Sequence, residues 1–376
     1  MLGVESRDSL AEGVAMKKRI LAASIAIVVL ALAVSGQKLE PPKLQPTAST
    51  ESQQQLIKEG VALHDEGDYD GAVSRYEQVL KENPADVRAL YEMAYSYYAQ
   101  KNYRKSIEVG YRGAQYKSPL LDAFYVQIGS CYDELGDSKT AIENYKFGIK
   151  LSPSSSLLQY NLAITYYRTE QLADAKATVK KAAVLDPNHP SSQLLLSSIF
   201  DKGSYRVPSL LAALRFLILE PGSKRSEVAL QRVKKLMQAG VTPKDGNNIS
   251  IVLDTGQKKD EGNFESIDLF LSLVKAANYT EENKDKSELQ LLVANFDSLF
   301  AMLSESKGKA DMSKFTWKYY VPYFGELKQR GHTEAFVYYV NQQNTIAGVN
   351  EWLEHNQSKV ADFRAWSKSY RWPKMD

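Results

Sequence analysis

Residues 181–190 read KAAVLDPNHP, a lysine-containing apolar run that is followed at once by Pro187. Proline cannot continue the hydrogen-bond ladder of a helix, so this stretch predicts a helix stop. Similar runs end at four other prolines: Pro84, Pro119, Pro153 and Pro221. The successive intervals between the five prolines are 35, 34, 34 and 34 residues. Helix stops at a nearly constant spacing predict that the chain repeats one structural unit.

Each unit holds two helical runs that are separated by a polar turn. Aligned on the prolines, the units begin near Gln53, Val87, Asp122, Ser156 and Pro190. The first unit places small residues at Gly60 and Ala72 and an aromatic residue at Tyr76. The third unit repeats these with Gly129, Ala141 and Tyr145, and the fourth has Ala163 and Ala175. Small residues allow the two helices of a unit to approach closely, and we expect Ala175 to be packed and Lys180 to face solvent.

This pattern resembles the tetratricopeptide repeat, a helix–turn–helix unit of 34 residues. The resemblance covers residues 53–223 and is strongest in units one, three and four. Unit two departs from the pattern at Ser106 and Gly110, and unit five departs at Ser209. The resemblance implies an all-α fold, a solenoid of about five repeats with the second and fifth degenerate. A smaller, mainly helical and aromatic-rich C-terminal domain is expected to follow.

Tetratricopeptide arrays use the first helix of each unit to line a concave surface that binds proteins or peptides. By the family's pattern, the second, fifth, ninth, twelfth and thirteenth residues of a unit face this groove. The expected partner-binding residues are Arg88, Tyr91, Tyr95, Tyr98, Val126, Ser130, Asp133, Tyr160, Ile164, Tyr167 and Arg168. Tyrosine suits contact surfaces, because it presents apolar area and a hydroxyl at a low entropic cost. Some of these rings could instead pack against the neighbouring unit.

The charged residues of the groove indicate which kind of ligand to expect. Arg88 and Arg168 flank the tyrosines, which favours a peptide with acidic and aromatic or aliphatic residues. A subset of the family holds a C-terminal carboxylate with asparagine and lysine, but Val61 occupies one of those positions here. The net charge of +2 gives no concentrated basic surface, so no nucleic-acid partner is expected.

The N-terminus has the pattern of a secretory signal. Three basic residues at 17–19 precede an apolar run from Ile20 to Val34, and Ser35 and Gly36 follow. Fifteen apolar residues are fewer than the roughly 20 that span a bilayer. We therefore expect an N-terminal extension and cleaved signal over 1–36 and a periplasmic or secreted protein. The alternative is an uncleaved anchor, which would be the chain's contact with the membrane. The proline-rich segment 37–52 predicts a disordered linker.

The C-terminal region, 224–376, resembles no family that we recognise. The stretch 223–240 predicts a helix that caps the array, and ISIVL (249–253) is the one candidate strand of the turn-rich stretch 241–263. All four tryptophans lie beyond residue 310, among many tyrosines and phenylalanines. The spacing of Phe336, Tyr339 and Val340 is helical, although a strand at 335–340 is an alternative. Such aromatic density is typical of a packed core rather than of a cofactor site.

Little in the sequence indicates catalysis. Glu351 and His355 are one helical turn apart, but no further metal ligand is evident and a solvent-exposed pair is the simpler reading. Cys131 is the only cysteine and predicts a small packing residue. We expect no catalytic residues, no metal and no cofactor.

Two hypotheses on function follow from these patterns. The first is a non-catalytic exported scaffold that binds a protein or peptide through its tyrosine-lined groove. The second is a C-terminal aromatic domain that binds or processes a small molecule or glycan, with the repeats as a docking module. A closed aromatic core would favour the first hypothesis, and convergent carboxylates or histidines in a pocket would favour the second.

Overall fold

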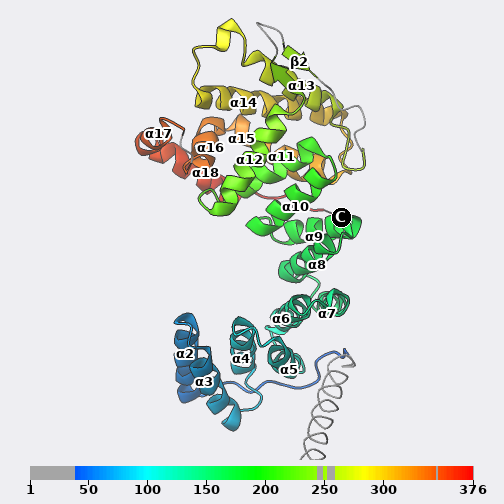
Figure 1. Ribbon diagram of the computed structural model, residues 1–376, viewed down its shortest axis with the longest axis vertical. Helices are drawn as coiled ribbons and strands as arrows, with labels where there is room; N and C mark the ends of the chain where they lie inside the picture. The colour runs from blue at the N-terminus through cyan, green and yellow to red at the C-terminus, as the bar shows by residue number, and fades with distance from the viewer. Residues whose placement is uncertain (1–38, 244–248, 252–258, 344–345, 376) are drawn as a thin grey trace, which may run out of the picture. The chain divides into compact units, whose positions relative to one another are not determined.

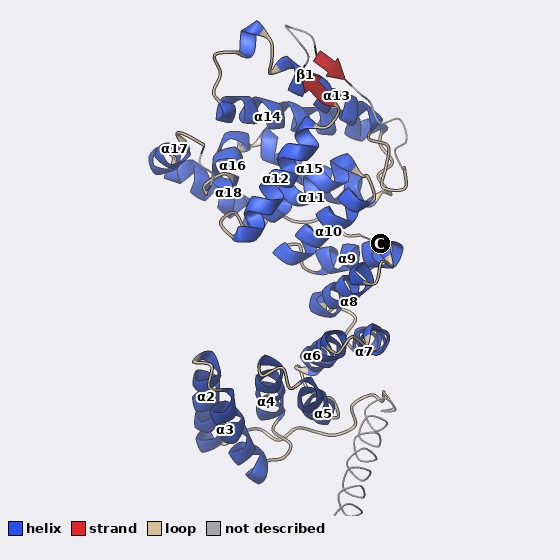
Figure 2. Cartoon of the chain, in the orientation of Figure 1, coloured by secondary structure: helices blue, strands red, loops and turns tan. Residues whose placement is uncertain are grey.

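The computed structural model describes residues 39–243, 249–251, 259–343 and 346–375 (Figures 1 and 2). The expected N-terminal extension and signal, residues 1–36, lie outside this part of the chain. Within it, no helix combines the length and the apolar character that crossing a bilayer requires. The chain divides into two compact units, with the boundary between Pro153 and Ser154.

The first unit consists of three antiparallel helix pairs. The pairs are α2 (Glu51–Asp65) with α3 (Tyr69–Glu82), α4 (Val87–Ala99) with α5 (Tyr103–Gly113), and α6 (Leu121–Glu134) with α7 (Ser138–Leu151). The first helices of the three pairs contact one another in order, α2 with α4 and α4 with α6. They therefore share one side of the unit, as Figure 1 shows.

Close packing of small against large residues joins the helices of a pair, as the sequence predicts. A Cβ atom placed on Gly60 would lie 2.5 Å from the ring of Tyr76, and one on Gly129 would lie 2.4 Å from Tyr145. Both tyrosines are buried. Cys131 packs in the same layer, and its burial raises the pKa of the thiol to about 11. The thiol is therefore a packing group at neutral pH, as expected.

The turn between the two helices of each repeat has the same backbone in all five repeats. A residue with positive φ stands at Gly67 (87°), Lys101 (60°), Gly136 (80°), Glu170 (61°) and Ser204 (62°). These positions are 34 or 35 residues apart. Glycine adopts this conformation freely, whereas the other three side chains oppose it. Repeats two and five, which depart from the family's side-chain pattern, thus keep its geometry.

The segment 39–50 differs from the expected disordered linker, because it is bound along the first unit. Leu44 donates its backbone N–H to the Gln115 carbonyl (3.0 Å) and accepts one from Lys117 (2.9 Å). Further along, the backbone N–H of Thr47 donates to the Ala85 carbonyl (3.1 Å). A polar, proline-rich segment cannot build a core of its own, but its backbone can pair with groups that the inter-repeat turns leave open. Sequence composition does not reveal such pairing.

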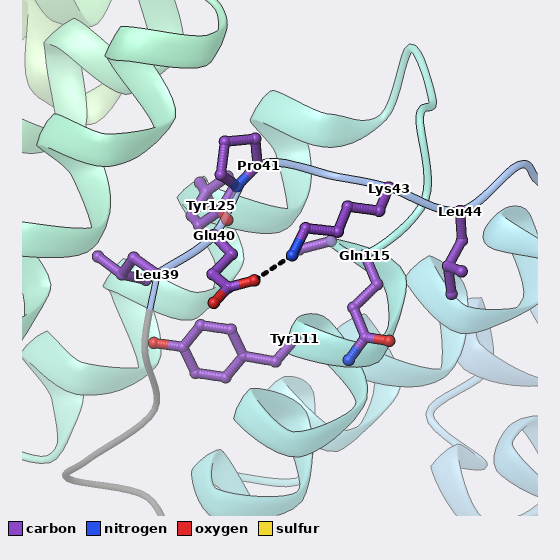
Figure 3. A pocket seen from close by; sticks show the side chains of 9 residues that line it. Leu39, Glu40, Pro41, Lys43, Leu44, Tyr111, Gln115 and Tyr125 are labelled. Atoms are coloured by element: carbon purple, nitrogen blue, oxygen red, sulfur yellow. Dashed lines mark hydrogen bonds and ion pairs between the residues drawn. The ribbon is translucent and has the colours of Figure 1, made fainter.

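This bound segment encloses a small cavity of about 290 Å³ over α5 and α6 (Figure 3). Glu40 and Lys43 form an ion pair of 2.5 Å at its mouth. Both side chains are exposed to solvent, so the pair adds little to stability. The remaining lining is Leu39, Pro41, Leu44, Tyr111, Ala114, Gln115 and Tyr125.

The second unit combines two further helix pairs with the C-terminal helices. The pairs are α8 (Ser156–Arg168) with α9 (Leu172–Leu185), and α10 (Pro190–Lys202) with α11 (Arg206–Leu219). The later elements are α12 (Lys224–Gln238), β1 (Val241–Pro243), β2 (Ile249–Ile251), α13 (Glu265–Ala277), α14 (Glu288–Ser306), α15 (Phe315–Gln329), α16 (Thr333–Val340), α17 (Val349–His355) and α18 (Gln357–Ser369). Short 3₁₀ turns at Glu281–Asn283 and Lys307–Lys309 flank α14.

The division at 153 differs from the expected domain boundary near 223. The cause is α11, which is apolar on nearly all sides and is buried along almost its full length. A helix of this kind must be enclosed by others, and α11 contacts α12, α13, α15 and α16. The fourth and fifth repeats therefore share one core with the C-terminal helices.

Most predicted elements of the C-terminal region are present. The expected capping helix corresponds to α12, and the expected strand corresponds to β2. Its antiparallel partner β1, which pairs Val241 with Ile251, was not anticipated. Residues 335–340 are helical, within α16. The aromatic residues form a closed core, in which Tyr319, Tyr320 and Tyr323 on α15 are completely buried.

One expected solvent-facing residue is instead part of this unit's packing. The ammonium of Lys180 lies 2.5 Å from the carboxylate of Glu261 and 5.1 Å from the ring centroid of Phe315. Glu261 is almost completely buried and also pairs with Lys176 at 3.1 Å. Burial lowers the pKa of Lys180. The acidic partner comes from a loop 81 residues away in sequence, so helical periodicity could not indicate it.

Ala175 is completely buried on α9, as the repeat register predicts. Replacing it by leucine is expected to lower the free energy of unfolding by about 1–3 kcal/mol, because overpacking forces the close helices apart. Ala177→Leu is the matched control, since Ala177 is exposed on the same helix. Urea denaturation of both variants measures the difference. Equal losses of stability would contradict the repeat register.

Candidate partner-binding surface

The tyrosine face of the first unit consists of Arg88, Tyr91, Tyr95 and Tyr98, which recur along one side of α4. Spacings of three and four residues place side chains one above another on a helix. Arg88 is exposed, and Tyr91 and Tyr98 are half-buried. Tyr95 is 44% exposed, the most accessible of the three rings.

Stacking holds the exposed ring of Tyr95 in place. The imidazole of His64 on α2 lies parallel to it, with ring centroids 4.8 Å apart. Tyr91 is also parallel to Tyr95, with ring centroids 6.4 Å apart, and Tyr91 itself meets Phe124 of α6 edge-on at 5.7 Å. The Nδ1 atom of His64 is hydrogen-bonded to the buried Ser96 hydroxyl at 2.8 Å. The face is therefore a pre-ordered aromatic surface built from three successive first helices.

The hydroxyls of Tyr91 and Tyr98 are neutral at physiological pH. Burial, together with Glu134 and Cys131, raises the pKa of Tyr98 to about 12. Burial also raises the pKa of Tyr91, with a further contribution from Glu92. A neutral phenol can both donate and accept a hydrogen bond.

The expected contact residues on α6 contribute less exposed surface. Val126 and Ser130 are half-buried, and the Ser130 hydroxyl lies 3.2 Å from the hydroxyl of Tyr145. Asp133 is only 6% exposed, and it accepts a hydrogen bond from Ser138 at 3.2 Å. Its carboxylate therefore fixes the turn into α7 and is a poor candidate for partner contact.

The second unit presents its own set of expected residues on α8. Tyr160 is half-buried and meets His189 edge-on, with centroids 4.7 Å apart. The ammonium of Lys202 lies 5.5 Å from the ring centroid of Tyr167. Ile164 is half-buried and Arg168 is exposed. Lys202 also pairs with Glu170, just after the end of α8.

Sequence reasoning missed two residues of these surfaces, the half-buried His64 and the exposed Leu157. His64 is the twelfth residue of the first repeat, and Leu157 is the second residue of the fourth repeat. Leu157 is 47% exposed. Both stand at register positions that the family's pattern assigns to the groove, so applying the register to every repeat would have found them.

The histidines of the described residues are engaged in packing or in backbone contacts. His355 Nδ1 lies 2.7 Å from the backbone oxygen of Glu351, and this contact does not involve the Glu351 carboxylate. His332 packs against Trp366 with centroids 5.4 Å apart. Within the described ranges, no cluster of three histidine, cysteine or acidic side chains is arranged to hold a metal ion.

Comparison with known proteins identifies the repeats. Residues 63–109 and 123–155 each match a family model described as tetratricopeptide repeat. With the helix pairs and the recurring turn described above, these matches show that the chain contains tetratricopeptide repeats. No curated protein matches it.

Three solved structures illustrate what part of this chain is similar to. A thermophilic tetratricopeptide-repeat protein of Thermus thermophilus is 22% identical, with 49% of this chain and 99% of that one covered and a TM-score of 0.41. The pilF protein of Pseudomonas aeruginosa is 17% identical over 50% of this chain and 89% of that one, with a TM-score of 0.40. YrrB, described as having an unusual peptide-binding site, is 14% identical over 48% and 90%, with a TM-score of 0.37.

Proposed function

We propose that this chain is a non-catalytic scaffold that binds a protein or peptide partner through the first helices of its repeats. The observation that carries the proposal is the exposed Tyr95 ring, which stacks with His64 and lies parallel to Tyr91. An aromatic side chain that is both exposed and already ordered loses little entropy when it makes contacts. Interface hot spots are enriched in tyrosine and arginine, and Arg88 lies on the same face.

The alternative function, a small-molecule or glycan site in the C-terminal region, receives less support. The rings that would line such a site, among them Tyr319, Tyr320 and Tyr323, are completely buried against one another. We place the scaffold outside the cytoplasm, in the periplasm or secreted, with N-terminal anchoring as the alternative. This localisation rests on the signal pattern of residues 16–36.

The double variant Tyr95→Ala with Tyr160→Ala tests the proposal. Truncating a hot-spot residue typically costs about 2 kcal/mol, so recovery of partner should fall by about 30-fold or more. The measurement is affinity capture from the native host, with co-purified proteins quantified by mass spectrometry. Tyr279→Ala is the matched control, because Tyr279 is 49% exposed and lies outside the repeats.

Stability decides how a loss of capture is interpreted. Helicity by circular dichroism and the melting temperature should change little in the double variant. Loss of folding together with capture would mean that these rings belong to the core. Full capture by a folded double variant would contradict the proposed site.

A further inference from the structure

Carboxylates surround the tyrosine face of the first unit. Asp65 is the last residue of α2, Glu92 stands on α4 one turn after Arg88, and Glu134 is the last residue of α6. Asp65 and Glu134 are exposed. After burial, Glu92 is the next cause that raises the pKa of Tyr91, and Glu134 has the same role for Tyr98. The rings therefore lie in a negative electrostatic field. The sequence prediction considered only the flanking arginines and did not anticipate this field.

Glu92 is the carboxylate that is placed to receive a cation. Its side chain is 22% exposed, and burial raises its pKa, with Asp65 adding to the effect. Arg88 lies 3.9 Å away, which is beyond hydrogen-bond distance, and its own side chain is 58% exposed. A carboxylate that is half-removed from water gains from a closer, hydrogen-bonded positive charge.

The aromatic rings favour the same kind of ligand. The face of an aromatic ring attracts lysine and arginine side chains within about 6 Å of its centroid. Tyr95, stacked on His64 and parallel to Tyr91, offers such rings beside Glu92. Carboxylates that stand next to ordered, partly exposed rings offer a cation both an ion pair and a cation–π contact.

We propose that the tyrosine face of the first unit recognises a basic segment of the partner, with an arginine or lysine side chain bound between Glu92 and the rings of Tyr91 and Tyr95. This inference rests on the proposed function and specifies its ligand. It differs from the acidic peptide expected from sequence, because Asp65, Glu92 and Glu134 lie around the rings of this face, whereas Arg168 belongs to the other unit.

Two synthetic octapeptides, each with phenylalanine at every second position, test the proposal. Their binding to the full chain is measured. One carries arginine at the remaining positions, and the other carries glutamate. Isothermal titration calorimetry at low salt should show the arginine peptide binding at least tenfold more tightly. Glu92→Gln should weaken binding of the arginine peptide by about tenfold, as loss of a hydrogen bond to a charged group does. Glu143→Gln, an exposed glutamate on α7, should leave both affinities unchanged.

Each other outcome counts against the inference. It is overturned if the glutamate peptide binds as tightly as the arginine peptide, if Glu92→Gln has no effect, or if neither peptide binds. Tyr95→Ala separates this inference from the proposed function. If both peptides bind equally and Tyr95→Ala abolishes this binding, the face is the binding site but is not selective for basic partners. Binding that Tyr95→Ala does not change would contradict the proposed site itself.

Discussion

Arg215→Ala is expected to lower the free energy of unfolding of the second unit by about 3–5 kcal/mol. Arg215 is completely buried on α11. Its Nη1 donates to the hydroxyls of Tyr323 (3.1 Å) and Ser367 (3.0 Å), and its Nη2 donates to the side-chain oxygen of Asn188 (2.7 Å). Alanine would leave these groups without their donor and would open a cavity.

The guanidinium of Arg215 also lies between two aromatic rings. Its carbon is 4.9 Å from the ring centroid of Tyr323 and 5.0 Å from that of Trp372. The planar group thus joins the fifth repeat to α15 and to the C-terminal end of the chain. Arg215→Lys should recover part of the lost stability, because lysine keeps the charge but not the planar fork.

Chemical denaturation followed by tryptophan fluorescence measures these changes. Arg371→Ala is the control, since Arg371 is exposed, and it should change stability by less than about 0.5 kcal/mol. A similarly small effect of Arg215→Ala would show that the buried guanidinium is not a principal contact of this core.

Tyr145→Ala is expected to lower the free energy of unfolding of the first unit by about 3–5 kcal/mol, the usual cost of truncating a buried aromatic ring. Tyr145 is 1% exposed and fills the space over Gly129. Gly129→Val should also destabilise the unit, because its Cβ would lie 2.4 Å from the ring.

A double-mutant cycle tests whether these two residues act through one contact. With the ring removed, Gly129→Val should cost at least about 1 kcal/mol less than in the native chain, since the clash is gone. Urea denaturation of the four proteins gives the coupling energy. Strictly additive effects would show that the small residue and the ring do not constrain each other.

The repeats could be predicted from the sequence because their chemistry is local and periodic. Pro84, Pro153, Pro187 and Pro221 each follow a helix end by two residues, although α5 ends at Gly113, well before Pro119. The pairing of Gly129 with Tyr145 follows from their fixed spacing. The stripe of Tyr91, Tyr95 and Tyr98 on α4 follows from helical periodicity alone.

The remaining features depend on contacts between distant segments. Lys180 forms an ion pair with Glu261. Arg215 is hydrogen-bonded to residues that lie 27 to 152 positions away in the sequence. The linker residue Leu44 is bound by Gln115 and Lys117 through backbone groups, which no side-chain pattern encodes. In the degenerate repeats the backbone turn is kept although the local side chains oppose it. Lys101 and Ser204 both have a positive φ there, which their side chains do not favour.

Site-specific photo-crosslinking in the native host tests the binding surface most directly. The photoreactive residue p-benzoylphenylalanine is placed at Tyr95 in one variant and at Gln78, which is exposed on α3, in another. The aromatic replacement keeps a large ring at position 95, so binding should persist there. We expect a partner protein to be crosslinked from position 95 and not from position 78. Crosslinking of the same protein from position 78 alone would contradict the assignment of the first-helix face as the binding surface.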